Sequence, residues 1–426
     1  MIDQENGATL YVNSSAMTLS GLIFNRYLIK MVVVLCLAGT LQAQDHPANN
    51  LRLVEQKEIL TGAQRTELYL PLLAGLKVGI VCNNTSLIGE IPLADSLVNR
   101  GVNVIKVFTP EHGFKGDRSA GMEINDTSRT RSDVPVISLY GIKKKPSPDD
   151  LKGIDIMVFD IQDVGVRFYT YISTLSLVME ACEEHGIPLI VLDRPNPNGF
   201  YVDGPVLDTC CHSFVGMHPV PIVYGLTIGE YARMVNGEGW LRDSMRCDLT
   251  VIPLKGWERN MIVKLPVRPS PNLPNWKSVY LYPFICLFEG TVISVGRGTE
   301  YPFQVIGHPN MVWGSFAFTP RNIPGVAENP PFQDQNCYGT YLTGYAENYR
   351  NITDPFTLWY LLNAYKNMFL GDAFFNNYFE NLAGSRDMRI QIENGLTEEQ
   401  IRKSWEPGLE AYKKIRAKYL LYPDIQ

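Results

Sequence analysis

The first candidate for acid–base chemistry in this 426-residue chain is the sequence VFTPEHGFKG at residues 107–116. The carboxylate of Glu111 and the imidazole of His112 follow an apolar run and a proline. Side chains of both kinds can transfer a proton to or from a reacting group. The glycine after them lets the backbone approach a ligand closely. The alternative interpretation is an ordinary solvated turn, because glutamates in loops mostly face water.

Three further groups of polar residues follow apolar runs directly, as Glu111 does. Such groups can act on one ligand only if the apolar runs are strands that end at the same edge of a sheet. Together with Glu111 they would then form one site rather than separate turns. The three groups are Asn83, then Asp160, Gln162 and Asp163, and finally Asp193, Arg194 and Asn196.

The apolar runs alternate with segments of helical spacing, and this pattern predicts an α/β fold with a parallel sheet. Near-continuous apolar runs are typical of strands that helices cover on both faces. In open parallel sheets the ligand crevice lies outside the carboxyl ends of the strands, where all four polar groups stand. Strands are predicted at residues 77–82, 102–108, 134–139, 154–159 and 188–192, and helices at residues 65–73, 92–99, 171–185, 358–369 and 397–419.

The sequence DIQDVGVRFYTY, which begins at Asp160, contains the densest set of functional side chains. Asp160 and Asp163 offer carboxylates for a second catalytic role. Arg167 offers a planar fork that suits a substrate carboxylate. Tyr169 and Tyr171 supply hydroxyl groups and aromatic faces. The competing interpretation is an internal ion pair between Arg167 and one of the aspartates, which would fix the loop instead of binding a ligand.

The sequence becomes proline-rich and irregular over residues 265–283, and a second domain is predicted from about residue 276. Asn272 lies in the motif SPN, while Glu289 and Arg297 lie in the motifs EGT and GRGT. The glycines around Arg297 resemble a tight anion-binding loop, but the flanking residues of nucleotide-binding loops are missing. We therefore expect these three side chains to bind substrate, without a nucleotide.

The composition argues against several kinds of partner and cofactor. A formal net charge of −6 leaves no basic excess to neutralise the phosphates of a nucleic acid. The eight cysteines are scattered and contain no C-x-x-C pair, so neither a disulfide framework nor a cysteine zinc site is expected. The six histidines form no H-E-x-x-H motif. We therefore expect no metal and no other cofactor.

The N-terminal segment predicts export to the periplasm or the cell exterior. Arg26 and Lys30 precede an apolar run at residues 31–38, and small residues around Ala43 fit a cleavage site. This is the order of a secretory signal peptide. The run is shorter than the roughly 20 apolar residues that cross a bilayer, so no stable membrane anchor is expected. The alternative is a buried N-terminal strand.

The order of these motifs resembles that of a known family. The exo-β-N-acetylmuramidases of the NamZ type are similar to this chain in NNTSLIG, FTPEHGFKG, FDIQDVGVRFYTYISTL, LDRPNPNG, PSPNLPN, FEGT and VGRGTEYPF. The resemblance implies a Rossmann-like catalytic domain at residues 51–275 and a smaller α+β auxiliary domain at residues 276–426. Residues 1–43 are then the signal peptide and an N-terminal extension. The chain departs from the expected pattern at Arg268 and at residues 308–310, which bears on its substrate range.

The resemblance also implies a reaction and a partner. The family releases a non-reducing terminal N-acetylmuramic acid from peptidoglycan fragments, with a catalytic glutamate that corresponds to Glu111. The second catalytic role falls to Asp160 or Asp163, or to the acetamido group of the substrate itself. Arg167 is the candidate for binding the lactyl carboxylate of muramic acid. Two alternatives are a non-catalytic protein that binds cell-wall sugars and a nucleotide- or metal-dependent hydrolase.

Overall fold

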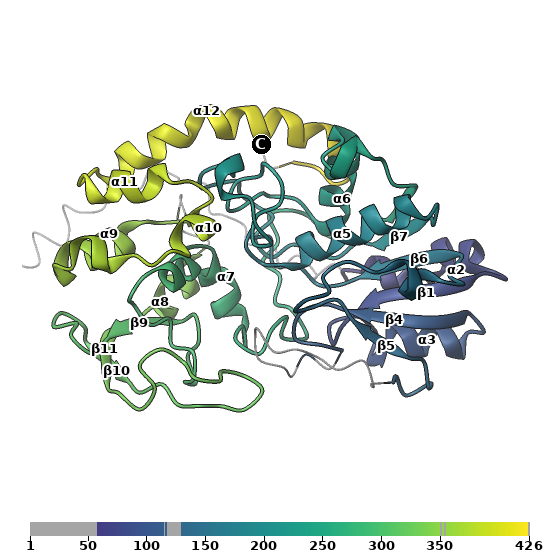
Figure 1. Ribbon diagram of the computed structural model, residues 1–426, viewed down its shortest axis with the longest axis horizontal. Coiled ribbons are helices and arrows are strands. Elements are labelled where there is room, and N and C mark those ends of the chain that lie inside the picture. The colour runs from purple at the N-terminus through teal and green to yellow at the C-terminus, as the bar shows by residue number, and fades with distance from the viewer. Residues whose placement is uncertain (1–57, 115, 117–128, 350–351, 353–354, 425–426) are drawn as a thin grey trace, which may run out of the picture. The chain divides into compact units, whose positions relative to one another are not determined.

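The computed structural model describes residues 58–114, 116, 129–349, 352 and 355–424. The signal peptide that we predict at residues 1–43 lies outside these described residues. The described chain belongs to one compact unit, Lys57–Gln426. A parallel sheet with flanking helices is followed by a smaller region with an antiparallel sheet and helices (Figure 1), which confirms the predicted fold class. The domain boundary near residue 276 stays a prediction.

The large sheet has six parallel strands in the order β5-β4-β1-β6-β7-β8. The order reverses between β1 and β6, as in doubly wound sheets whose ligand crevice opens beside that point. The edge strand β8 was not predicted, because its residues are mostly half-buried or exposed and form no apolar run. The strands are β1 (Lys77–Cys82), β4 (Asn103–Thr109), β5 (Val136–Ser138), β6 (Ile156–Asp160), β7 (Leu189–Leu192) and β8 (Leu249–Ile252).

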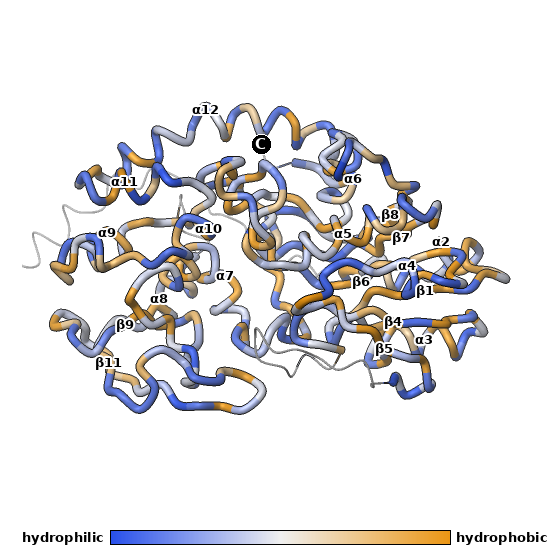
Figure 2. The backbone as a smooth tube through the Cα atoms, in the orientation of Figure 1, coloured by the Kyte–Doolittle hydropathy of each residue, from blue (hydrophilic) through white to orange (hydrophobic). Residues whose placement is uncertain are grey.

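Helices cover both faces of this sheet, which explains why its central strands are largely apolar on both faces. Ile80 of β1 belongs to the buried cluster that contains α2 and α3, while its neighbour Val81 belongs to the cluster of α5 and α6. Figure 2 shows the strands largely in the colour of hydrophobic residues, as expected for a parallel sheet without a solvent-facing side. The helices are α2 (Thr66–Leu73), α3 (Leu93–Asn99), α5 (Tyr171–Glu184) and α6 (Ile228–Glu238).

The C-terminal region has a small antiparallel sheet in the order β10-β11-β9. Its strands are β9 (Val305–His308), β10 (Phe316–Phe318) and β11 (Cys337–Tyr341). Its helices are α7 (Trp276–Ile285), α8 (Thr343–Glu347), α9 (Trp359–Met368), α10 (Phe379–Ala383), α11 (Asp387–Glu393) and α12 (Glu398–Arg416). The remaining elements before it are β2 (Leu87–Ile88), β3 (Ile91–Pro92) and α4 (Pro148–Leu151). None of the helices in the described part of the chain combines the length and the apolar character that crossing a membrane requires.

The end of the chain returns to the large sheet and binds there. The hydroxyl group of Tyr422 donates to Asp193 Oδ2 at 2.6 Å and accepts from the backbone N–H of Leu254 at 2.7 Å. Asp193 stands directly after β7. Because Asp193 is fully buried, its carboxylate needs such donors to offset the loss of hydration.

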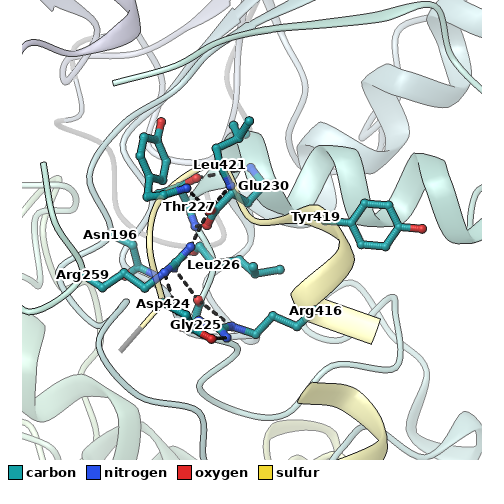
Figure 3. A network of polar contacts seen from close by, with 12 residues as sticks. Asn196, Gly225, Leu226, Thr227, Glu230, Arg259, Arg416, Tyr419, Leu421 and Asp424 are labelled. Carbon is teal, nitrogen blue, oxygen red and sulfur yellow. Dashed lines mark hydrogen bonds and ion pairs between the residues drawn. The ribbon is translucent and has the colours of Figure 1, made fainter. Parts of the chain in front are cut away.

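A network of charged side chains continues this attachment (Figure 3). Glu230 of α6 is fully buried and accepts from Arg259 and from the backbone N–H of Leu421, the latter at 2.8 Å. Arg416, at the end of α12, forms two 2.7 Å hydrogen bonds to the carboxylate of Asp424. Glu230 and Arg259 are both fully buried, so breaking their pair would leave an uncompensated charge. Through Glu230 the network fixes Leu421 to α6.

Candidate active site

A cavity of about 490 Å³ lies beside the loop that follows β4. Side chains from the large-sheet region and from the C-terminal region both line it. It brings together seven of the side chains that the sequence indicated, namely Glu111, His112, Tyr169, Tyr171, Asn272, Glu289 and Arg297. The other predicted site residues lie outside its wall.

Glu111 stands at the wall of this cavity, two residues after the end of β4. Its Oε2 atom accepts a hydrogen bond of 2.9 Å from the hydroxyl group of Thr170, which precedes α5. The side chain is half-buried, so the carboxylate is held on one side and open to a ligand on the other. A carboxyl group in this position can deliver a proton to a ligand in the cavity.

His112 adopts a backbone conformation that is uncommon for a residue with a side chain. Its φ is +70°, and its side chain is buried. Residues in the left-handed region cost free energy and occur often at functional sites. The Nε2 atom of His112 lies 3.3 Å from Oγ of Ser270, which also lines the cavity. His112 therefore connects the loop of Glu111 to the SPN motif.

Tyr169 and Tyr171 fix the same segment of the wall. Their hydroxyl groups donate to the backbone oxygen of Pro269 at 2.8 and 3.3 Å, and their rings pack edge to face with centroids 4.7 Å apart. Asn83 Nδ2 donates to the hydroxyl group of Tyr171 at 3.0 Å. Burial raises the pKa of both tyrosines, so they act as neutral donors. Asn83 thus contacts Tyr171, a residue of the wall, but does not itself line the cavity.

On the C-terminal side of the cavity, Arg297 forms a two-point ion pair with Glu289. The Nε and Nη2 atoms of Arg297 lie 2.5 and 3.1 Å from the two carboxylate oxygens. Asn272 Nδ2 donates to the backbone oxygen of Val326 at 2.8 Å. Within the described residues, the buried Oδ1 atom of Asn272 has no hydrogen-bond partner. These side chains are therefore held in place before any ligand binds.

The structure does not place Asp160 in the cavity, in contrast to the predicted catalytic role. Asp160 is fully buried, and its two oxygens accept hydrogen bonds of 2.6 and 2.8 Å from Nε and Nη2 of Arg194. The geometry is that of a bidentate carboxylate–guanidinium pair. Arg194 is occupied in the same way and is likewise absent from the cavity wall. Two predicted site residues thus neutralise each other at the sheet edge.

Asp163 and Gln162 also form hydrogen bonds within the protein and do not line the cavity. Asp163 Oδ2 accepts from the backbone N–H of Gly165 at 2.6 Å and from the hydroxyl group of Tyr224. Burial raises the pKa of Asp163 to about 6. Gln162 Nε2 donates to two backbone oxygens, those of Asp163 at 2.8 Å and Pro195 at 2.7 Å. Both side chains shape the loop after β6 and do not reach the ligand space.

Asp193 and Asn196 organise the start of α6. Asp193 accepts from the hydroxyl group of Thr227 at 2.7 Å and from the backbone N–H of Gly229 at 2.8 Å. Burial raises the pKa of Asp193 to about 7. Asn196 Nδ2 donates to the backbone oxygen of Leu226 at 2.7 Å. Asp193 and Asn196 therefore hold the segment that leads into α6, and in contrast to the predicted ligand site neither side chain lines the cavity.

Arg167 does not present its guanidinium group to the cavity, and we correct the predicted role in binding a substrate carboxylate. The side chain is fully buried. Burial lowers the pKa of Arg167 to about 9. Its described hydrogen bonds go to backbone oxygens, so the ion pair with an aspartate of the same loop is also wrong. The acceptors are Pro205 and Val220, each at 2.8 Å, Leu382 at 3.1 Å and Ala383 at 2.6 Å.

Several cavity residues were missed by the sequence analysis. Thr170 and Ser270 lie inside motifs that we had singled out, so their hydroxyl groups were available as candidates. Tyr378 and residues 326–331 carry no recognisable motif and reach the cavity only through the fold of the C-terminal region. Within the described ranges, no group of three or more His, Cys, Asp or Glu side chains is arranged to hold a metal ion.

Comparison of the sequence with known protein families gives matches over most of the chain. The model of the N-terminal part of exo-beta-N-acetylmuramidase NamZ matches residues 78–277, and the model of its C-terminal part matches residues 280–422. The peptidoglycan beta-N-acetylmuramidase NamZ of Bacillus subtilis (strain 168) is 40% identical over 375 residues, which cover 83% of this chain and 89% of that protein.

Two solved structures of DUF1343 family proteins from Bacteroides fragilis NCTC 9343 are similar to this chain. One has a TM-score of 0.80 and 45% sequence identity, and the other has a TM-score of 0.71 and 28% identity. Each comparison covers 86% of this chain and 100% of the other. The likeness therefore extends over the large-sheet region and the C-terminal region together.

Proposed function

The chain belongs to the family of the exo-β-N-acetylmuramidase NamZ, and on this premise we propose that it hydrolyses the bond of a non-reducing terminal N-acetylmuramic acid in peptidoglycan fragments. The observation that carries this proposal is the carboxylate of Glu111, held by Thr170 at the wall of a cavity of about 490 Å³. A cavity of this size is in the range of small-ligand sites. Aromatic side chains, among them Phe303 and Tyr378, complete a wall suited to the faces of a sugar.

Glu111 is the general acid in this proposal. Cleavage of a glycosidic bond needs a proton on the leaving oxygen while positive charge develops at the sugar carbon. The hydroxyl group of Thr170 occupies Oε2 of Glu111, which leaves Oε1 as the oxygen that carries and transfers the proton. The positions of Asp160 and Asp163 outside the cavity argue against either as its partner.

For the second role we propose the acetamido group of the substrate. Two other carboxylates line the cavity, but Glu289 is paired with Arg297, and the exposed Glu328 accepts from the backbone of Gly325 at 3.2 Å. The acetamido oxygen would bond to the anomeric carbon as the leaving oxygen departs with the proton from Glu111. Water then opens the cyclic intermediate and returns a proton to Glu111.

The first experiment measures turnover of a chromogenic N-acetylmuramyl glycoside by the wild-type protein and by Glu111→Gln. We expect clear wild-type turnover and a loss of about 10²- to 10⁴-fold in the variant, the usual contribution of a general acid. The matched control is Glu90→Gln, an exposed glutamate outside the cavity, which should keep the wild-type rate. Near wild-type turnover by Glu111→Gln would sink the assignment of the acid.

The same assay separates the proposed hydrolase from the two alternatives. Binding of muramyl sugars without turnover would identify a sugar-binding protein, and turnover that is lost with a chelator would identify a metal-dependent hydrolase. The anomer of the product, followed by NMR, tests the acetamido mechanism. Retention of configuration is expected for an internal nucleophile, whereas inversion would mean direct attack by water.

We also propose that the protein acts outside the cytoplasm. The support is the signal-peptide pattern at residues 1–43 together with a cell-wall substrate. N-terminal sequencing of the protein recovered from the cell exterior or periplasm should give a mature end close to residue 44. A full-length chain that stays in the cytoplasm would contradict this part of the proposal.

A further inference from the structure

Arg297 is the only arginine or lysine among the described residues that line the cavity. This matters because muramic acid differs from glucosamine by a lactyl ether, which carries a carboxylate. A site that prefers muramic acid needs a group that recognises this carboxylate. Arg167, which the sequence indicated for that role, is fully buried against backbone oxygens.

The backbone around Arg297 is fixed by the two glycines beside it. Gly296 and Gly298 both have φ of +78°, in the left-handed region that side chains disfavour. A Cβ atom at Gly296 would overlap the side chain of Val305, and one at Gly298 would overlap the backbone oxygen of Arg321. The loop is therefore closely packed on both sides, and it holds Arg297 at a defined place on the cavity wall.

The side chain of Arg297 is held along one edge and on one face. Glu289 accepts from Nε and Nη2, at 2.5 and 3.1 Å, so it occupies the side-on edge of the guanidinium group. The ring of Phe303 lies 4.9 Å from the Cζ atom of Arg297. Phe303 itself has φ of +54°, which is strained for a bulky residue and is typical of ligand clamps.

Glu289 does not occupy the end-on edge of the guanidinium group, which is formed by Nη1 and Nη2. No residue in the described part of the chain accepts a hydrogen bond from Nη1 of Arg297. Burial opposes the charge, but Glu289 raises the pKa of Arg297, so the group stays a cation. An arginine can bind two carboxylates at once, one on each edge, through parallel N–H···O hydrogen bonds.

We propose that the end-on edge of Arg297 binds the lactyl carboxylate of the terminal muramic acid and thereby selects muramyl over glucosaminyl substrates. This inference rests on the proposed function. Glu289 would act as a positioning residue, since it fixes the guanidinium group without touching the substrate. A ligand without the carboxylate would leave the donors of Arg297 without their charged acceptor, and sites built in this way discriminate strongly.

The test compares kcat/KM for two chromogenic muramyl glycosides, one with the free lactyl carboxylate and one with the same group as a neutral amide. The wild-type protein should prefer the carboxylate. In Arg297→Gln we expect kcat/KM for the carboxylate substrate to fall by about 10- to 100-fold, which corresponds to the loss of a charged hydrogen bond. The value for the amide substrate should change little, so the preference should disappear.

Arg297→Lys keeps the charge and removes the fork, and it covers the case in which Arg297→Gln does not fold. It should lose most of the preference for the carboxylate while still turning over both substrates. The matched control is Arg321→Gln, since Arg321 also pairs with a carboxylate, Asp334 at 2.6 Å, but lies exposed and outside the cavity. This variant should keep the wild-type preference.

The outcomes distinguish this inference from the function on which it rests. If the wild-type protein does not turn over either muramyl glycoside, the proposed function fails. If the wild type prefers the carboxylate and the folded Arg297 variants keep that preference, the function stands and Arg297 is not the selective group. An equal fall of kcat/KM for both substrates would likewise overturn the inference, because it would mean a structural role.

Discussion

The hydroxyl group of Thr170 donates a hydrogen bond of 2.9 Å to Oε2 of Glu111. The two residues come from different strand ends of one sheet, since Glu111 follows β4 and Thr170 follows the loop after β6. The bond fixes which oxygen of the carboxyl group faces the protein. It thereby orients the proposed acid before a substrate enters the cavity.

Replacing Thr170 by valine should lower the kcat of muramyl glycoside hydrolysis by roughly tenfold or more. Glu111 becomes a carboxylate as it gives up its proton, and a hydrogen bond to such a charged acceptor contributes about 1.5–3 kcal/mol. Valine keeps the shape of threonine and removes only the hydroxyl group. Thr170→Ser restores the donor and should stay close to the wild-type kcat. If the serine variant is as slow as the valine variant, the hydroxyl group is not what orients Glu111.

Replacing Asp160 by asparagine should destabilise the fold and leave the chemistry of the folded enzyme intact. Arg194 would lose a buried carboxylate, and breaking such a pair costs about 3–5 kcal/mol. Denaturant unfolding gives the free energy, and kcat per mole of folded enzyme gives the activity. The control is Asp133→Asn, whose exposed pair with Arg129 should contribute less than about 1 kcal/mol. A stable but inactive Asp160 variant would restore the catalytic assignment.

Two buried carboxyl groups should make the stability depend on pH in an unusual direction. Burial raises the pKa of Asp163 to about 6 and that of Asp193 to about 7, whereas aspartates of an unfolded chain titrate near about 4. Between these values the folded protein binds more protons than the unfolded chain. These two groups therefore lower the free energy of unfolding as the pH rises from about 4 to about 7, with no further effect above that range.

Asp163→Asn removes one of these titrations and should flatten the pH dependence. In this variant the free energy of unfolding should differ less between pH 5 and pH 8 than in the wild type. The reduction is expected to be on the order of 1 kcal/mol, since one pKa unit corresponds to about 1.4 kcal/mol. Denaturant unfolding at the two pH values measures it. Asp149→Asn, at a strongly exposed carboxylate, serves as the control and should leave the slope unchanged. An equal slope in wild type and Asp163→Asn would contradict the assignment.

Replacing Tyr422 by phenylalanine should cost about 1–3 kcal/mol of the free energy of unfolding, because Asp193 Oδ2 and the N–H of Leu254 both lose a buried partner. The kcat should not change, since Tyr422 lies outside the cavity. Tyr338→Phe is the control, because that tyrosine is partly exposed and its hydroxyl group accepts only from Asn336 at 3.2 Å. Equal effects of the two substitutions on stability would disprove a special role for Tyr422.

The sequence predicted the large sheet well because burial on both faces leaves a continuous apolar run. The run at residues 77–82 became β1 without a change of bounds. The edge strand β8 has one covered flank and only one buried residue, Ile252, so its sequence contained no comparable signal. Apolar runs therefore identified the strands of this sheet except β8, and the opposite edge strand β5 was among those predicted.

The sequence predicted the site less completely. It indicates that polar residues gather at the carboxyl edge of the sheet, but it does not show which hydrogen-bond or ion-pair partner each of them has. Asp160 and Arg194 stand at that edge as expected, and the structure shows that they neutralise each other. Arg167 and Arg297 were both reasonable candidates for an anion. Which of them faces the cavity depends on the packing of residues far apart in the chain, and no local pattern contains that information.

The bond between Asp193 and Tyr422 joins residues that are 229 positions apart. A ribosome therefore releases Asp193 well before Tyr422, and the large sheet lacks this buried hydrogen-bond partner in the meantime. A chain cut short before Tyr422 would leave Asp193 Oδ2 and the N–H of Leu254 buried without that partner. We expect such a chain to be cleaved by a protease faster than one that contains Tyr422.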